Sequence, residues 1–177
     1  MPTMTKEERL AEIRQRIDDL EARAGDGTAE TRARLQRRFD ALRDDADAAS
    51  AALDEKADAI QERFADLESR VDIAAKREAS ELAGDATSFA DAVEAELHDW
   101  DVAIERMQAR AAVKAYTARE RAEASVAELR NARNRAAERL TAARSSTGEA
   151  WEEQKKRVTV ALDDLEQKAG EATAKFK

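Results

Sequence analysis

The side chains that could bind a metal or support catalysis are few in this sequence. His98 is the only histidine, and Glu94 lies four residues before it, so on a helix the two side chains would share one face. Helical di-metal centres take carboxylate and histidine ligands from several helices, and no second histidine exists here. We therefore expect His98 to lie on a solvated face, and we expect neither a metal site nor a cofactor.

Nucleophilic and redox chemistry are also restricted. The chain has no cysteine, which excludes a disulfide framework, a thiolate nucleophile and cysteine-based zinc or iron–sulfur sites. Glycine-rich phosphate-binding motifs and the glycine-flanked serine of hydrolases do not occur. The many carboxylates are expected on exposed helix faces, where nothing removes them from water as acid–base catalysis requires. The sequence predicts a protein that is not an enzyme and has no small-molecule substrate.

The composition is typical of long helices. Charged residues make up 40% of the chain and aromatic residues only 4%, and five glycines and one proline are all that could interrupt a helix. The net charge of −8 disfavours nonspecific binding to nucleic acids and to anionic lipids. No apolar run approaches the roughly 20 residues of a membrane span, and the first residues contain no apolar signal segment. We expect a cytoplasmic protein.

Apolar residues recur at alternating spacings of three and four, which is the pattern of a helix that packs lengthwise against another. Thr5 and Glu8 have the spacing of a capping box at the first helix start. Gly25, Gly84 and Gly148 lie where the apolar stripes stop. The sequence therefore predicts four helices, over residues 5–24, 28–83, 88–144 and 149–175.

The segment 28–83 contains an internal repeat. The apolar residues at 35, 39 and 42 recur at 60, 64 and 67, with the same offset in each case. That offset, twenty-five residues, is about seven helical turns, so the repeat keeps one face of a helix. The only irregularity is two successive steps of four between Ala49 and Ala57, which we interpret as a stutter within one continuous helix.

The predicted lengths imply an all-α fold. The two long helices would each be about 84 Å long at 1.5 Å per residue, and two helices of equal length joined by a short break predict an antiparallel coiled-coil hairpin. The two shorter helices both leave its open end, where we expect them to fold back and form a partial four-helix bundle. The whole chain, 1–177, would be a single elongated helical domain.

Charge supports the docking of the shorter helices. Folding the first helix back places Asp18, Asp19 and Glu21 near Arg32 and Arg34. Folding the last helix back places four acids near four arginines of the third helix: Glu149, Glu153, Asp163 and Asp164 near Arg130, Arg133, Arg139 and Arg144. Such surface pairs contribute little energy each, so they support the register of the helices more than the stability of the fold.

The part of the hairpin beyond the bundle would bury little apolar area, because many of its seam residues are alanine. Such a stalk needs a partner, and a homodimer is the simplest. Residues 85–105 carry seven acids and no lysine or arginine, whereas residues 106–144 carry ten bases and four acids. This charge step could set the register of a dimer.

Six residues are candidates for contact with partners. Trp100 and Trp151 are the bulkiest side chains in an alanine-rich chain; both have seam spacing, so packing in the seam and insertion into a lipid or protein partner are alternatives. An arginine-rich run could contact nucleic-acid phosphates, but no aromatic residue is interleaved for base stacking, and pairing with the shorter helices is the favoured interpretation. We expect no nucleic-acid partner. The arginines are Arg130, Arg133, Arg135 and Arg139.

Residues 92–177 resemble a known family. The segments AVEAELHDWDVAIERMQARA, ELRNARNRAAERL and GEAWEEQKKRVTVALDDLEQKA are similar to the bacterial coiled-coil stress-response proteins first named from cyanobacteria. Gln154 and Val160–Ala161 depart from the pattern, where an apolar and an aromatic residue are expected, and residues 1–91 match only in composition. The matching residues are Trp100, Leu129, Arg130, Arg133, Ala150, Trp151, Glu152, Lys155, Ala161 and Leu165.

The resemblance implies a non-enzymatic role in stress tolerance, in a family compared with apolipoproteins and desiccation proteins; it identifies no ligand. Our first hypothesis is a self-associating helical protein that scaffolds or shields other proteins under stress. The alternative is a lipid- or granule-surface protein whose amphipathic helices separate and lie on a membrane, droplet or granule, as in apolipoproteins and phasins. A third option, a nucleic-acid regulator acting through the arginines, predicts binding that weakens steeply with salt.

Overall fold

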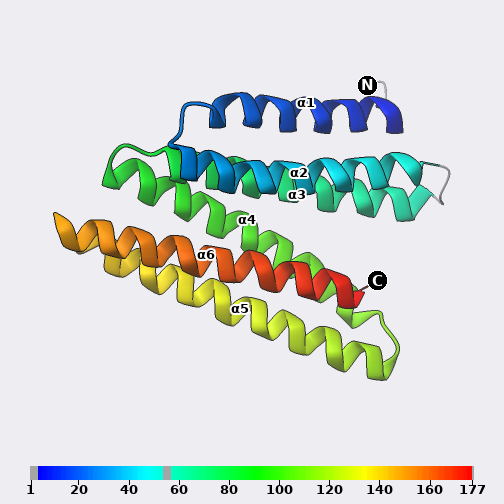
Figure 1. Cartoon of the computed structure of the whole chain (residues 1–177). Coiled ribbons are helices and arrows are strands. Elements are labelled where there is room, and N and C mark those ends of the chain that lie inside the picture. Colours follow the sequence, from blue (N-terminus) through cyan, green and yellow to red (C-terminus); the bar gives the residue numbers. More distant parts are fainter. Residues whose placement is uncertain (1–3, 54–56, 177) are drawn as a thin grey trace. The chain divides into compact units, whose positions relative to one another are not determined.

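The computed structural model describes residues 4–53 and 57–176, and there the chain forms six α-helices and no strand. The predicted all-α class is confirmed. Contacts between Cα atoms divide the chain into two compact units, unit 1 (Met1–Ala92) and unit 2 (Val93–Lys177), with the division inside one helix. The helices are α1 (Lys6–Ala24), α2 (Ala29–Ala51), α3 (Ala57–Leu82), α4 (Ala86–Ala112), α5 (Tyr116–Arg144) and α6 (Glu149–Phe176) (Figure 1).

Short polar residues start several of these helices. The Thr5 hydroxyl accepts a hydrogen bond from the Glu8 amide at 3.1 Å, and the Thr5 amide donates to the Glu8 carboxylate at 2.8 Å, so the predicted capping box is confirmed. Thr28 caps α2 through its hydroxyl in the same way. At the start of α4 the Ser88 amide donates to the Asp85 carboxylate at 2.9 Å, and this hydrogen bond lowers the pKa of Asp85.

Unit 1 has a core to which α1, α2 and α3 all contribute apolar stripes. Every stripe residue predicted for the first helix is buried, and two phenylalanines provide the largest apolar side chains. Apolar area removed from water stabilises such a core by about 25 cal/mol per Å². The buried core residues are Leu10, Ile13, Ile17, Leu20, Ala24, Leu35, Phe39, Leu42, Ala46, Ala49, Ile60, Phe64, Leu67, Val71 and Ala74.

Ion pairs fix the directions of the helices in unit 1. Arginines at seven-residue intervals along α1 reach acids that follow one another in the same order along α3, so α1 and α3 run parallel. The first of these arginines also lies over the Phe64 ring, 5.3 Å from its centroid. Seven residues are about two helical turns, so one face of α1 carries all three pairs. The pairs are Arg9–Glu68, Arg16–Asp72 and Arg23–Glu78.

The first helix docks on α2, as expected, but in a different register. Arg43 forms ion pairs with Asp18, at 2.9 Å, and with Glu21. The sequence predicts Arg32 and Arg34 as the partners of these acids, and both lie at least about two and a half helical turns before Arg43 in α2. The register follows the burial of the α1 and α2 apolar stripes in one core, since exposed ion pairs are too weak to override that packing.

The single helix predicted over 28–83 is wrong: the structure has two helices, α2 and α3, which pack against each other. The internal repeat is therefore not a repeat within one helix; it is the same apolar stripe on two antiparallel neighbours, joined across by an ion pair between Asp45 and Arg70. The interval interpreted as a stutter contains the end of α2 at Ala51 and the start of α3 at Ala57. Folding back brings Phe39 and Phe64 into one core, which a continuous helix would keep about 38 Å apart.

Unit 2 contains most of α4 together with α5 and α6, and α5 and α6 pack along their lengths. Alanines dominate the buried face of α5, so the two helices can approach closely. The Arg135 guanidinium pairs with Asp164 at 2.7 Å, and the Lys175 ammonium lies 3.5 Å from the Ser125 hydroxyl, which makes α6 antiparallel to α5. The last helix therefore folds back as expected, but with other ion pairs: Asp164 meets Arg135, and the predicted partners Arg133 and Arg144 pair with acids of α4.

The single helix predicted over 88–144 is also wrong. It is divided at residues 113–115, and α5 runs back alongside α4. Arg144 pairs with Glu94 at 2.7 Å and Arg133 pairs with Asp101 at 2.6 Å, so rising residue numbers on α4 meet falling numbers on α5. The predicted hairpin of two long, continuous helices is therefore not formed, because each long segment is divided and its second half runs antiparallel to its first.

Candidate functional site

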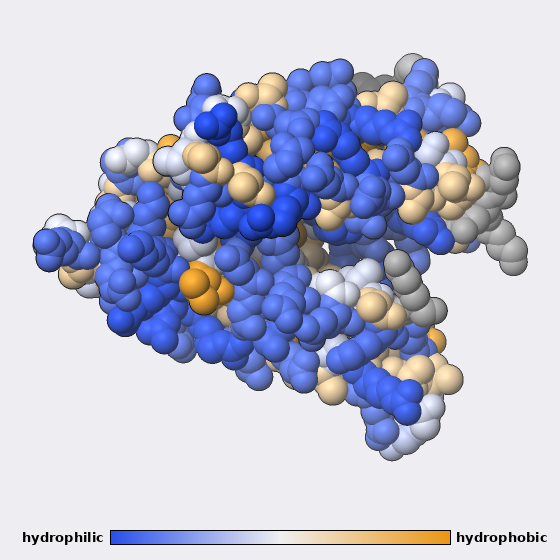
Figure 2. Space-filling model, in the orientation of Figure 1, coloured by the Kyte–Doolittle hydropathy of each residue, from blue (hydrophilic) through white to orange (hydrophobic). Residues whose placement is uncertain are grey.

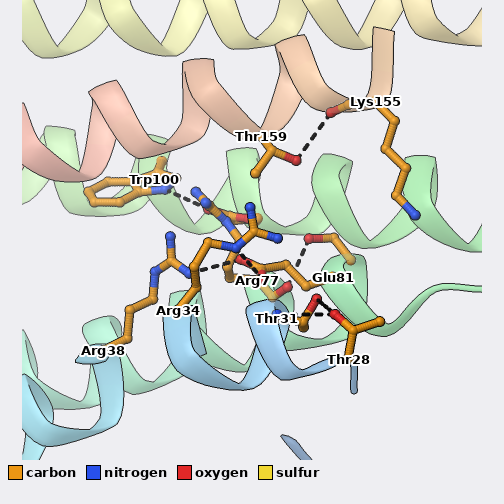
Figure 3. Close-up of polar contacts among 11 residues, drawn as sticks. Thr28, Thr31, Arg34, Arg38, Arg77, Glu81, Trp100, Lys155 and Thr159 are labelled. Carbon is orange, nitrogen blue, oxygen red and sulfur yellow. Dashed lines mark hydrogen bonds and ion pairs between the residues drawn. The ribbon is translucent and has the colours of Figure 1, made fainter. Parts of the chain in front are cut away.

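The two tryptophans predicted to contact partners have different environments. Trp100 on α4 is buried, with 4% of its surface exposed, and its indole N–H donates to the Glu96 carboxylate at 3.3 Å (Figure 3). Glu96 is also fully buried. Trp151 lies in the first turn of α6 and is half-buried. Trp100 is thus a packed residue whose polar atom already has a partner, which is the usual arrangement for a buried indole.

The α5 arginines proposed as interaction residues are mostly engaged within unit 2. Arg133 pairs with Asp101 and Arg135 with Asp164, and Arg130 donates to the side chain of Gln108. Arg139 is exposed and forms no ion pair among the described residues. Arg133 and Arg135 thus reach acids on different helices, α4 and α6.

These pairs also explain the charge step between residues 85–105 and 106–144. The acids at 94 and 101 lie on α4, and the bases that they meet, Arg144 and Arg133, lie on α5 of the same unit. The acids and bases on the two sides of this step therefore meet within the chain, between α4 and α5.

Sequence reasoning missed a group of buried charges near the end of α3. The Glu81 side chain is only 3% exposed and lies between two arginines of α2, with Arg38 at 2.9 Å and Arg34 at 3.4 Å (Figure 3). One turn earlier, buried Glu78 receives two hydrogen bonds of 3.2 Å from Arg23 of α1. The one sequence signal of this group was the spacing of three residues between Glu78 and Glu81 near the end of an amphipathic helix.

This buried group can fix the register of α1, α2 and α3, because a carboxylate taken out of water is tolerated only where cations meet it. Removing Arg38 would take from Glu81 the nearer of its two α2 cations and leave it with Arg34, whose Nε makes no hydrogen bond. Breaking a buried pair in this way is strongly destabilising. We assign the group to structure and not to chemistry, since each acid here is held by arginines that cannot give up a proton at neutral pH.

A second feature missed from the sequence is the turn between α4 and α5. Val113 and Tyr116 are 86% and 77% exposed, more than any other large apolar side chain in the described chain. The cap position of α5 is Ala115, which makes no side-chain hydrogen bond, in contrast to the threonines that cap α1 and α2. The signal was a gap in the apolar stripe between Ala111 and Ala118, where a lysine, Lys114, takes the seam position.

The surfaces are otherwise polar. Figure 2 shows a face that is mostly hydrophilic, with apolar residues in small separate patches. His98 is exposed on α4. Among residues 4–53 and 57–176 no three histidine, aspartate or glutamate side chains come together as a metal site. None of the described helices combines the length and the apolar character needed to cross a bilayer.

Comparisons of the chain with known protein families, with curated protein sequences and with solved structures find no match. The resemblance to the coiled-coil stress-response family therefore rests on the residues of the 92–177 segment alone. Of these residues, Trp100, Leu129 and Leu165 are buried in the structure.

Proposed function

We propose that the protein acts without catalysis, as a self-associating helical structural protein that scaffolds or shields other proteins during stress. The observation that carries this proposal is the difference between the buried helix faces, which are apolar, and the exposed faces, which are charged. The apolar stripes are buried where the helices pack, and the outer faces carry paired charges. A folded copy therefore presents hydrated, charged helix surfaces to its surroundings.

Such a surface suits shielding for a physical reason. Hydrated charged bodies with a net charge far from zero remain in solution, and they separate aggregation-prone molecules from one another. Arginines of α1 and α2 pair with acids of neighbouring helices on the surface of unit 1. The similarity of residues 92–177 to stress-response proteins supports the same role.

Two measurements test the proposal. A heat-labile enzyme is warmed with increasing amounts of the protein, and light scattering from the enzyme should fall in proportion to the amount added. An equal mass of an unrelated folded acidic protein serves as the control, and equal protection by both would refute specific shielding. Sedimentation velocity over a wide concentration range tests self-association, which a constant monomer coefficient would refute.

The alternative, a lipid- or granule-surface protein that opens its helices, needs a larger rearrangement. The apolar face of each helix in unit 1 is directed into the shared core, so all three helices would have to separate before lipid could reach those faces. Opening would exchange close packing between side chains for contact with lipid, with little gain in buried apolar area. We therefore place this alternative second.

A further inference from the structure

The turn between α4 and α5 has an apolar end that the fold does not cover. We define the α4–α5 tip as residues 106–119, which comprise the last two turns of α4, the turn itself and the start of α5 (Figure 1). Val113 and Tyr116 are its most exposed apolar side chains, and Ala112, Ala115 and Ala118 are exposed beside them. Single exposed apolar residues are ordinary, but a continuous group at the end of a helical hairpin indicates a binding surface.

The charge of the tip is opposite to that of the whole chain. Residues 106–119 contain four bases and no acid, in a protein with a net charge of −8. Glu105 and Glu120 flank the segment, and Arg119 pairs with Glu123 at 2.7 Å, so Arg106, Arg110 and Lys114 are the bases on which the electrostatic argument depends. Arg106 and Arg110 are four residues apart and share a face of α4, and Lys114 lies in the turn between the two exposed apolar residues. Charges farther away than the Debye length of about 8–10 Å are largely screened at moderate salt, so the tip can meet an anionic surface despite the acids elsewhere.

We propose that the α4–α5 tip docks on anionic lipid surfaces, with Val113 and Tyr116 entering the headgroup region and the surrounding bases meeting lipid phosphates and carboxylates. Tyrosine is enriched at membrane interfaces, because its ring has an apolar body and a polar hydroxyl, and a neighbouring valine adds apolar area. Single-stranded nucleic-acid sites stack successive bases on several aromatic side chains, whereas Tyr116 is the one aromatic residue of the tip, so the tip fits a lipid surface better than a single-stranded nucleic acid.

This docking differs from the opening of amphipathic helices, because the tip is exposed while the helices stay packed. It is also independent of the proposed shielding function, since a shielding protein could bind lipid or not. Each lysine or arginine near an anionic membrane strengthens binding by about fivefold, so a site with these three bases gives weak and reversible attachment that falls with added salt.

The test uses the absence of cysteine from the chain, which makes any introduced cysteine a unique labelling site. Val113→Cys carries an environment-sensitive fluorophore, and Val160→Cys, at a position 67% exposed on α6, carries the same label as a matched control. Each protein is mixed with vesicles of phosphatidylcholine alone and with vesicles that also contain phosphatidylserine. We expect a blue shift for the label at 113 with the anionic vesicles only, lost at high salt, and no shift for the label at 160.

A second pair of variants tests the bases. Arg110→Gln/Lys114→Gln should lower the partition coefficient on anionic vesicles by about 25-fold, at about fivefold for each base. Lys156→Gln/Arg157→Gln on α6 makes the same change in net charge away from the tip and should change partitioning far less. Far-ultraviolet circular dichroism checks that all variants remain helical, and a label at Tyr116→Cys repeats the test at the second apolar position.

Three results would overturn the proposal. Labels at 113 and 116 that do not respond to anionic vesicles would exclude docking by the tip. A blue shift at 160 as well as at 113 would mean that the helices open onto lipid. A response of the label at 113 to a single-stranded oligonucleotide, without a response to vesicles, would assign the tip to nucleic acid.

Discussion

Spin labels at positions 45 and 70 test the separation of α2 from α3. The Arg70 guanidinium on α3 pairs with the Asp45 carboxylate on α2, so the two positions lie on neighbouring helices, whose axes in packed bundles are about 8–10 Å apart. The same positions are 25 residues apart in the sequence, and in one continuous helix they would be separated by about 38 Å. The chain has no cysteine, so Asp45→Cys/Arg70→Cys can be labelled at these two sites alone.

The substitutions themselves should be tolerated. Both side chains are about half-exposed, and loss of an exposed pair costs at most about 1 kcal/mol. The matched control is Arg119→Cys/Arg144→Cys, since these two positions have the same separation in the sequence as 45 and 70 but lie on the single helix α5, Tyr116–Arg144. Dilution of labelled protein with unlabelled protein removes distances between copies.

Pulsed electron–electron double resonance should distinguish two packed helices from one continuous helix. We expect label-to-label distances below about 20 Å for the 45/70 pair, from the spacing of adjacent helices plus the label arms, and about 38 Å for the 119/144 pair. A 45/70 distance as long as the 119/144 distance would mean that residues 28–83 form the continuous helix that the sequence predicts. That result would refute the three-helix core of unit 1.

Two further predictions concern stability. Gly170→Ala should raise the free energy of unfolding of unit 2 by about 0.5–1 kcal/mol, because residue 170 lies inside α6 and an added Cβ meets nothing within 4 Å. Urea unfolding followed by tryptophan emission measures this change, since both tryptophans lie in unit 2. An unchanged unfolding midpoint would contradict the prediction. The side-chain hydrogen bond from Arg43 lowers the pKa of Glu21, so its stabilisation is present above the unfolded value of about 4.3 and is lost as the pH falls through the lower folded value. Glu21→Gln should therefore show a smaller loss of thermal stability than the wild type between about pH 5 and pH 3, whereas parallel curves would exclude a role for this pair.

Local sequence signals located the helix ends that have a capping residue or a glycine. The capping box at Thr5, the stop at Gly25 and the start of the last helix after Gly148 are visible in the sequence, and the structure has them. Gly148 adopts a φ of +58°, a left-handed conformation that glycine takes without strain. The ends of α2 and α4 have no such signals: Ala52 caps α2 at its end, and Ala115 precedes α5.

The candidate interaction residues could likewise be predicted only in part from the sequence. The tryptophans and the α5 arginines stand out by residue type, but residue type does not reveal that Trp100 is buried or that Arg133 is paired with an acid on α4. The exposure of Val113 was not predicted either: valine is usually a buried residue type, and only the fold places residue 113 in a turn that nothing covers.

The sequence by itself determined that the chain is helical and which face of each helix is apolar. That information is local, because the helical period of about 3.6 residues assigns each side chain to a face regardless of what the helix packs against. Only the tertiary structure decided where the two long helical segments divide. A helix interruption gives up a few backbone hydrogen bonds that water can replace. Dividing the first segment between Ala51 and Ala57 lets large side chains of α2 and α3 share one core, and dividing the second at residues 113–115 lets arginines of α5 reach acids of α4. This gain depends on contacts between residues far apart in the sequence, such as Phe39 and Phe64, and no local pattern contains it.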